Sequence, residues 1–347
     1  MLPDDEHRDL WIVDGRVSAT PVADATSIGE GWLLPGLVDA HCHIGVDADG
    51  PIDRDSQEQQ ATTERDAGVL LARDCGVPSD TRWMDERDDL PRIVRAGRHV
   101  ARPKRYIRNF GVEVEPEELV ETVARQAERS DGWVKLVGDW IDRETGDLGP
   151  CWPTGALAAA VERAHQLGAR VTTHVFGEQA LPDLLAAGVD CVEHGTGLSD
   201  EQIAAMAAAQ TALVPTRINI DTFPRIAASA TKFPAYAAHM LALHARVDRM
   251  IASAYEAGVP IYAGTDAGGS LAHGLIAQEV QALHRAGMSA VDAIAAASWS
   301  ARDWLGHPPS LVEGAPADFV MLEEDPRKNL AALAHPSRVV LRGTVVA

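Results

Sequence analysis

Short apolar stretches alternate with alanine-rich helical stretches through most of the chain. Polar and apolar positions recur at helical spacing in residues 117–129, 155–167, 179–187, 200–209, 240–257, 274–286 and 290–305. The apolar stretches have the length and composition of strands in residues 37–43, 68–75, 92–100, 133–137, 169–175, 191–194, 212–216 and 260–266. This alternation predicts an α/β protein with a parallel sheet, and eight such units predict a (β/α)8 TIM barrel of roughly 250 residues.

Both ends of the chain carry further strand-like segments. Residues 9–13 and 16–19 flank Asp14-Gly15, a pair that favours a hairpin turn. Residues 317–322 and 339–346 are also strand-like, and the second segment contains Gly343. We therefore expect residues 1–36 and 306–347 to form a small β-sandwich domain beside a barrel formed by residues 37–305.

Composition and charge limit the classes of partner. Among 347 residues, 51 acidic against 31 basic side chains give a net charge of −20, which argues against binding to nucleic acid or to anionic membranes. No apolar run approaches the roughly 20 residues of a membrane span, and the acidic first residues do not resemble a signal peptide. Four dispersed cysteines favour a reduced, cytoplasmic setting. We expect a small-molecule substrate, with homo-oligomerisation left open.

Candidate metal ligands stand at the ends of five predicted strands, where the catalytic groups of such barrels lie. The first strand ends in His41 and His43, whose spacing of two residues points both imidazoles to one face. Neutral imidazole and carboxylate are ligands that suit Zn²⁺. The remaining candidates, one each on the fourth, fifth, sixth and eighth strands, are Lys135, His174, His194 and Asp266.

Lys135 needs a separate explanation, because a protonated amine would repel metal ions. Only four of the 31 basic residues are lysines, so this chain normally uses arginine where it needs positive charge. A deprotonated lysine reacts with CO2 to form a carbamate, an anionic ligand able to bridge two metals. Arginine cannot do so, since its guanidinium stays protonated. Lys135 therefore indicates a carbamylated bridging ligand, against the alternative of an ordinary lysine that reaches solvent or pairs with an acid.

The motifs around these residues resemble the amidohydrolase superfamily. Within it they are most similar to the branch of imidazolonepropionase-like proteins and metal-dependent Xaa-Pro or Xaa-Arg dipeptidases. The resemblance covers nearly the whole chain. It rests on the segments Gly36-Leu37-Val38-Asp39-Ala40-His41-Cys42-His43, Ala72-Arg73-Asp74-Cys75-Gly76, Gly188-Val189-Asp190-Cys191-Val192-Glu193-His194-Gly195, Gly264-Thr265-Asp266-Ala267-Gly268 and Gly314-Ala315-Pro316-Ala317-Asp318-Phe319-Val320.

The resemblance implies a centre of two divalent metal ions, most often zinc. His41, His43 and Asp266 would hold one ion, His174 and His194 the other, and a carbamate on Lys135 would bridge them. Water bound to such a metal reaches a pKa of roughly 7, so hydroxide is available at neutral pH. Asp266 is the expected catalytic acid–base group, which would pass a proton to the leaving nitrogen of a cleaved amide.

Three further residues are candidates for contact with substrate. Arg217 follows the seventh predicted strand and could pair with a carboxylate. His273 lies in the loop after Asp266, and Tyr106 lies in the stretch 104–111. Dipeptidases of the branch usually carry a Gly-Gly-His segment after the third strand, whereas residues 104–111 contain no histidine. That difference argues against assuming dipeptide specificity.

Three alternatives compete with cleavage of a C–N amide bond in a dipeptide or N-acyl amino acid. The first two are opening of a cyclic amide, as in imidazolonepropionase, and a mononuclear deaminase. Lys135 argues against both, because a mononuclear centre needs no bridging carbamate. The third is a non-catalytic binding protein that keeps the fold. All six expected ligands are present, which argues against it.

Overall fold

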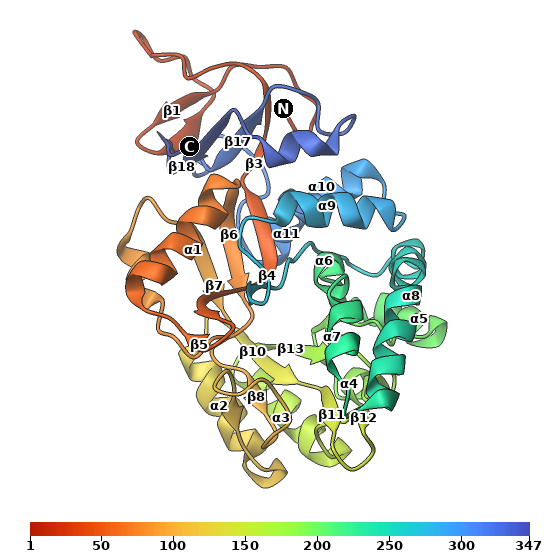
Figure 1. The fold of residues 1–347 in the computed structure, drawn as a ribbon. Helices are drawn as coiled ribbons and strands as arrows, with labels where there is room; N and C mark the ends of the chain where they lie inside the picture. Colours follow the sequence, from red (N-terminus) through yellow and green to blue (C-terminus); the bar gives the residue numbers. More distant parts are fainter.

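Two curved parallel sheets form the barrel in the computed structural model, which describes residues 1–347 (Figure 1). Neighbouring strands in the first sheet are β16 (Ala267–Gly269), β4 (Leu37–Asp47), β6 (Val69–Asp74) and β7 (Arg92–Arg95). In the second sheet they are β15 (Ala212–Val214), β14 (Cys191–His194), β13 (Arg170–Val175), β10 (Trp133–Val137), β8 (Val100–Ala101) and β9 (Val112–Glu113). The predicted α/β barrel is confirmed.

The barrel strands are apolar because both of their faces are covered. Every residue of β6 and β10 is buried, and only the last residue of β4 is exposed. A strand covered on one side by helices and on the other by the barrel interior reads as a continuous apolar run. Short antiparallel additions extend this frame: β5 (Gly50–Pro51) pairs with β4, and β11 (Asp139–Asp142) pairs with β12 (Asp147–Pro150).

The third predicted strand, residues 92–100, is not continuous. It is divided into β7, which pairs with β6, and β8, which pairs with β10. Gly97 lies between the two pieces at a φ of +73°, a conformation that side chains disfavour. A β-carbon there would also lie 2.9 Å from Oε1 of Gln126. The prediction of one strand was wrong because this glycine turns the backbone out of the ladder.

The eighth predicted strand, residues 260–266, is also corrected. Only an isolated bridge between Ile261 and Leu213 joins this segment to β15. Its backbone nevertheless closes the barrel, since the amide of Leu213 donates to the carbonyl of Pro260 and the amide of Ala40 donates to that of Ala263, both at 2.8 Å. Regular strand structure resumes only after Asp266, in β16.

Helices surround the barrel and follow most of the predicted positions. They are α1 (Arg54–Asp66), α2 (Leu119–Arg129), α3 (Thr154–Gln166), α4 (Leu181–Ala186), α5 (Asp200–Ala209), α6 (Arg217–Ile220), α7 (Phe223–Ser229), α8 (Pro234–Glu256), α9 (Ile276–Arg285), α10 (Ala290–Ala296) and α11 (Trp299–Trp304). The helix predicted at 290–305 is broken at Ser298, whose hydroxyl donates to the carbonyl of Pro35 at 2.7 Å. No helix combines the length and the apolar character that crossing a membrane requires.

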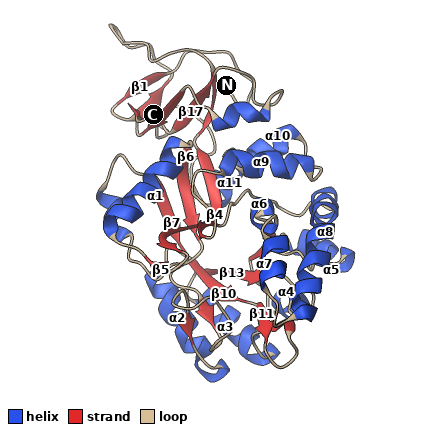
Figure 2. Cartoon of the chain, in the orientation of Figure 1, coloured by secondary structure: helices blue, strands red, loops and turns tan.

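The two chain ends meet in a small antiparallel sheet above the barrel (Figure 2). Its strands follow the order β19 (Thr344–Val345), β18 (Arg338–Leu341), β17 (Phe319–Leu322) and β3 (Trp32–Pro35). A separate hairpin joins β1 (Trp11–Val13) to β2 (Arg16–Ser18). Val17 of the hairpin packs with Phe319 and Val340 of the four-stranded sheet, so the hairpin and the sheet share a small apolar core. The division of the chain at residues 36 and 306 stays a prediction.

Replacement of Gly264 by alanine tests the closure of the barrel. A β-carbon at this buried position would lie 2.6 Å from Cβ of His41 and 2.6 Å from Cγ1 of Val214. Because neither backbone can move freely, we expect Gly264→Ala to lower the free energy of unfolding by about 1–3 kcal/mol, measured by urea denaturation. Gly155→Ala is the matched control, since its β-carbon meets nothing within 4 Å. Equal stability of the two variants would contradict the packing argument.

Candidate metal centre

The six predicted ligands converge at the C-terminal end of the barrel. His41 and His43 come from β4, Lys135 from β10, His174 from β13 and His194 from β14, and Asp266 precedes β16. Nε2 of His43 lies 3.0 Å and Nε2 of His41 3.2 Å from Oδ1 of Asp266. The two nitrogens lie 3.2 Å apart. Ligands of a tetrahedral Zn²⁺ lie about 3.3 Å apart, so these three atoms fit around one ion.

The other predicted ligands form a second group beside the first. Nδ1 of His174 lies 2.9 Å from Nε2 of His194, and the rings of His41 and His194 have centroids 5.2 Å apart. Lys135 is 1% exposed, and its Nζ has no hydrogen-bond partner. Nε2 of His174 is also buried without a partner. Unpaired buried polar atoms are costly, so their presence here fits a site that binds an additional group.

Three of the four histidines share one arrangement. Each directs Nε2 to the other ligands and pairs Nδ1 with an oxygen behind the site. These oxygens are Oε2 of Glu193 for His41 at 2.7 Å, the carbonyl of Gly76 for His43 at 3.1 Å, and Oγ1 of Thr216 for His194 at 2.7 Å. Outer contacts of this kind fix the orientation of a metal-binding imidazole and its tautomer.

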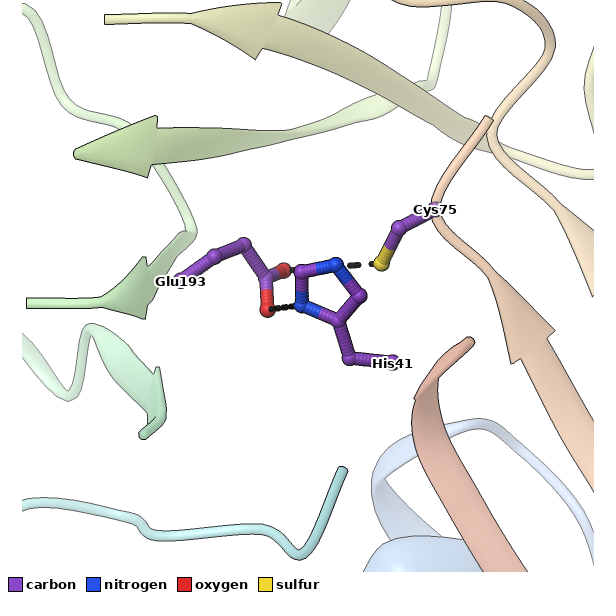
Figure 3. A group of neighbouring side chains, drawn as sticks. All are labelled: His41, Cys75 and Glu193. Carbon is purple, nitrogen blue, oxygen red and sulfur yellow. Dashed lines mark hydrogen bonds and ion pairs between the residues drawn. The ribbon is translucent and has the colours of Figure 1, made fainter. Parts of the chain in front are cut away.

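Glu193, which binds Nδ1 of His41 (Figure 3), also binds the guanidinium of Arg73 at 2.6 Å. Neither side chain is exposed, and Arg73 in turn stacks over the rings of Trp133 and Trp304. Although burial opposes ionisation, Arg73 holds the pKa of Glu193 well below its usual range. With Cys75 the pair His41 and Glu193 has the spacing of a metal site. The ion pair with Arg73 instead makes Glu193 a support for His41.

The protonation states suit metal binding. Burial lowers the pKa of His43 and His174, and it lowers that of His194 to about 3, so these imidazoles are neutral and able to donate a lone pair. Burial would raise the pKa of Asp266, but His41 and His43 hold it well below its usual range. The carboxylate is therefore ionised. His41 is the exception: burial would lower its pKa, but Cys75, Glu193 and Asp266 raise it well above the usual value, so this imidazole would release a proton on binding a metal. Neutral imidazoles with one carboxylate form a donor set suited to Zn²⁺ or a similar divalent ion.

The backbone is strained where the site is built. His194, Thr216 and Asp266 all adopt positive φ angles, of 66°, 45° and 59°. Such angles are uncommon for residues other than glycine, and for a β-branched residue such as threonine they are rare. Strain of this kind persists only where surrounding contacts enforce it, and it concentrates at functional sites. One enforcing contact is Asp39, whose Oδ1 accepts from the amides of His41 at 3.0 Å and Thr265 at 3.1 Å.

Asp266 occupies the solvent side of the group. Its side chain is 19% exposed, against 1% for His41 and 6% for His43. Oδ2 accepts a hydrogen bond from Nδ2 of Asn219 at 2.7 Å, while Oδ1 faces the histidines. The side chain thus has one oxygen toward the ligand cluster and one bound by Asn219. Asn219 was not anticipated, and its position after the seventh strand was the only signal.

The three residues predicted to contact substrate lie in different surroundings. The ring of Tyr106 lies 5.8 Å from that of His174, within the site. Nδ1 of His273 binds Oε1 of Glu64 at 2.8 Å. Arg217 pairs with Asp221 at 2.6 Å and with Asp248 at 2.5 Å, so its guanidinium is already occupied by carboxylates of this chain. The structure brings Tyr106 to the ligands and does not bring Arg217 there.

A histidine does follow the third barrel strand, contrary to the expectation drawn from residues 104–111. His99 lies immediately before β8, its ring centroid is 5.2 Å from that of His43, and its Nε2 pairs with the hydroxyl of Tyr106 at 3.0 Å. Because the sequence predicts one continuous strand over residues 92–100, it does not indicate His99 as a residue of the site. The break at Gly97 turns the chain so that His99 reaches the site.

Comparisons with known proteins identify relatives over most of the chain. An uncharacterized protein of Mycobacterium tuberculosis is 58% identical over 344 residues, covering 99% of this chain and 93% of the relative. Ochratoxinase of Aspergillus niger is 25% identical and covers 88% of this chain and 73% of the relative. A crystal structure of an Xaa-Pro dipeptidase with methionine bound in its active site superposes with a TM-score of 0.76 at 25% identity, covering 90% of this chain and 86% of that one.

The model of the amidohydrolase family matches residues 32–346, nearly the whole chain. This match confirms the resemblance drawn from the motifs. The clustered histidine and aspartate side chains are consistent with the metal centre of such enzymes. The chain belongs to the amidohydrolase family of metal-dependent hydrolases.

Proposed function

We propose that the protein is a binuclear metal hydrolase that cleaves a C–N amide bond in a small substrate, of the dipeptide or N-acyl amino acid type. The observation that carries this proposal is the unpartnered Nζ of Lys135, buried at the same barrel end as His41, His43, His174, His194 and Asp266. In a site for one metal ion, a protonated lysine would repel the ion, and no bridging ligand is needed. As a carbamate it would supply the second anionic ligand that two ions need.

Two divalent ions would leave the site positively charged. The carboxylate of Asp266 and a carbamate on Lys135 would offset two of their four positive charges. Bound there, the metals would activate water and polarise the substrate carbonyl. His41, His43 and Asp266 would hold one ion, and His174 and His194 the other. Zinc is the metal that this donor set suits best.

Asp266 is the proposed acid–base group. Its lowered pKa keeps it ionised, so it is able to accept a proton from the attacking water. It is also the exposed member of the ligand group, with Asn219 orienting Oδ2. The carboxylate of Asp266 would then return the proton to the leaving nitrogen, which completes cleavage of the amide. Neither step requires a second titratable side chain.

The surroundings of His174 favour an apolar or aromatic substrate group. The rings of Phe176, Trp140 and Tyr106 have centroids 4.4, 5.4 and 5.8 Å from that of His174. Arg105, the cation of this region, is bound by Asp142 at 2.9 Å and by backbone carbonyls. Phe176 belongs to the core, whereas Trp140 and Tyr106 are only partly buried and offer aromatic surface beside His174, as ligand sites for apolar groups do. Amides with an aromatic or large apolar side chain are therefore the first substrates to test.

A substrate screen tests the reaction class. We expect the zinc-loaded protein to hydrolyse N-acyl amino acids or dipeptides with aromatic side chains, and to act more slowly on glycine or aspartate analogues. Amine release measured across dipeptides, N-acyl amino acids and lactams would show this preference. Turnover of lactams alone would favour the cyclic-amide alternative, and turnover of aminopurines or similar amines would favour a deaminase.

Replacement of Lys135 tests the bridging role. We expect Lys135→Ala to bind fewer metal ions per chain and to lose more than about 100-fold in kcat/KM, since a bridging ligand should exceed the effect of an outer contact. Short carboxylic acids added to this variant should restore part of the activity. Lys232→Ala is the control, because Lys232 is exposed. Unchanged metal content measured by mass spectrometry would sink the bridging role.

Replacement of Thr216 tests the support of His194. Thr216→Val removes the partner of Nδ1 without leaving a buried charge, so we expect metal affinity to fall by about 10- to 100-fold while the fold persists. Competition with a metal-binding dye measures this affinity. Thr196→Val is matched to it, because Oγ1 of Thr196 donates to the carbonyl of Phe176 at the same 2.7 Å. Equal affinities in the two variants would show that Thr216 does not position His194.

A further inference from the structure

A cavity of about 540 Å³ lies at the end of the barrel opposite the proposed metal centre. Arg92 and Arg170, which line it, are the first residues of β7 and β13, whereas His174 stands near the end of β13. Arg342, from the turn between β18 and β19, lines it from the small sheet, and His307 follows α11. The cavity therefore lies between the barrel and the sheet built from the chain ends.

Three of the four arginines that line the cavity lack carboxylate partners. Arg92 is exposed and forms no ion pair within the chain. The guanidinium of Arg170 stacks over Trp133 at 4.1 Å and donates to the carbonyl of Trp304 at 3.0 Å. Arg342 donates only to backbone carbonyls, among them that of Leu90 at 3.2 Å. All three thus keep N–H groups available for a ligand.

The acidic residues of the cavity do not neutralise these cations. Asp85 and Asp131 both bind Arg95, at 2.9 and 3.3 Å. Asp131 also binds Arg82 at 3.0 Å. Only Asp88 remains as a carboxylate without a cationic partner among the lining residues. Four arginines and three aspartates line the cavity, so its lining carries a net charge of +1 in a chain whose net charge is −20.

The pKa values of two residues that line the cavity, Arg170 and His307, are lowered. Burial and the nearby charge of Arg73 lower the pKa of Arg170. Burial and the charges of Arg302 and Arg92 lower the pKa of His307. In both cases neighbouring cations disfavour the charged form, against a smaller opposing effect of Asp190 on Arg170 and of Asp318 on His307. An anion placed among them would relieve this repulsion.

The shape of the cavity indicates the size of its ligand. Ligand pockets typically measure roughly 300–1,000 Å³ and combine apolar walls with a few polar groups. Met84, Ile93, Val94 and Leu305 supply the apolar part of the wall. Guanidinium groups bind phosphate and carboxylate through paired hydrogen bonds. A small molecule with an anionic group and a short apolar portion matches both features.

We propose that this cavity is a binding site for a small anionic metabolite, recognised through a phosphate or carboxylate group by Arg92, Arg170, Arg342 and His307. The site is separate from the metal centre and does not depend on the reaction proposed there. It would place a bound anion between the barrel and the small sheet, where it would link Arg342 to the strands that begin at Arg92 and Arg170.

Calorimetric titration of the metal-loaded protein with inorganic phosphate, and separately with citrate, tests the proposal. We expect Arg92→Gln to weaken binding by about tenfold or more, as loss of a charge-assisted hydrogen bond predicts. We expect a similar effect of His307→Gln, because a bound anion would favour the protonated form of His307. Arg143→Gln is the control, because Arg143 is exposed and unpaired at a distant turn. Tighter binding of phosphate or of citrate would identify which anionic group the site prefers.

Two results would overturn the proposal. The first is the absence of any binding of either anion to the wild-type protein in the millimolar range. The second is binding that Arg92→Gln and His307→Gln leave unchanged, since such binding would belong to the metal centre or to the general surface. Both variants alter side chains outside the ligand cluster, so circular dichroism and metal content should match the wild-type protein.

Discussion

The buried carboxylate of Glu193 is the contact on which the centre of the barrel depends. It joins Arg73, a cation that could not otherwise be buried, to His41, the first of the proposed ligands. Removing either partner of a buried ion pair leaves an uncompensated charge, at a cost of about 3–5 kcal/mol. The same contact therefore stabilises the barrel interior and directs Nε2 of His41 toward His43 and Asp266.

The other ligands lie together because they stand at strand ends, and strained backbone angles at two of them orient their side chains toward the site. A regular strand would point adjacent residues to opposite faces. Glu193 and His194 are adjacent, yet both contact histidines of the site, because His194 has left the extended conformation for a φ of 66°. Asp266 does the same after the irregular eighth segment. Precise placement of ligands is thus obtained by departures from regular sheet structure, held in place by Asp39 and its neighbours.

The two ends of the barrel differ in charge. At one end, neutral imidazoles and an ionised aspartate create a place for cations. At the other end, unpaired guanidinium groups create a place for an anion. Arg73, near the proposed ligands, and Arg170, at the cavity, both stack over the buried ring of Trp133. Cation–π contacts with this ring help a strongly acidic chain to hold positive charge at both places.

The sequence by itself determined the barrel, the sheet formed by the chain ends and the six candidate ligands, because apolar periodicity and strand-end position are local properties. Only the tertiary structure decided the rest. Gly97 broke the third strand and brought His99 beside His43, and ion pairs within the chain occupied Arg217. Glu193, Thr216 and Asn219 acquired roles through partners far away in the chain. Such contacts join distant segments, so no local pattern records them.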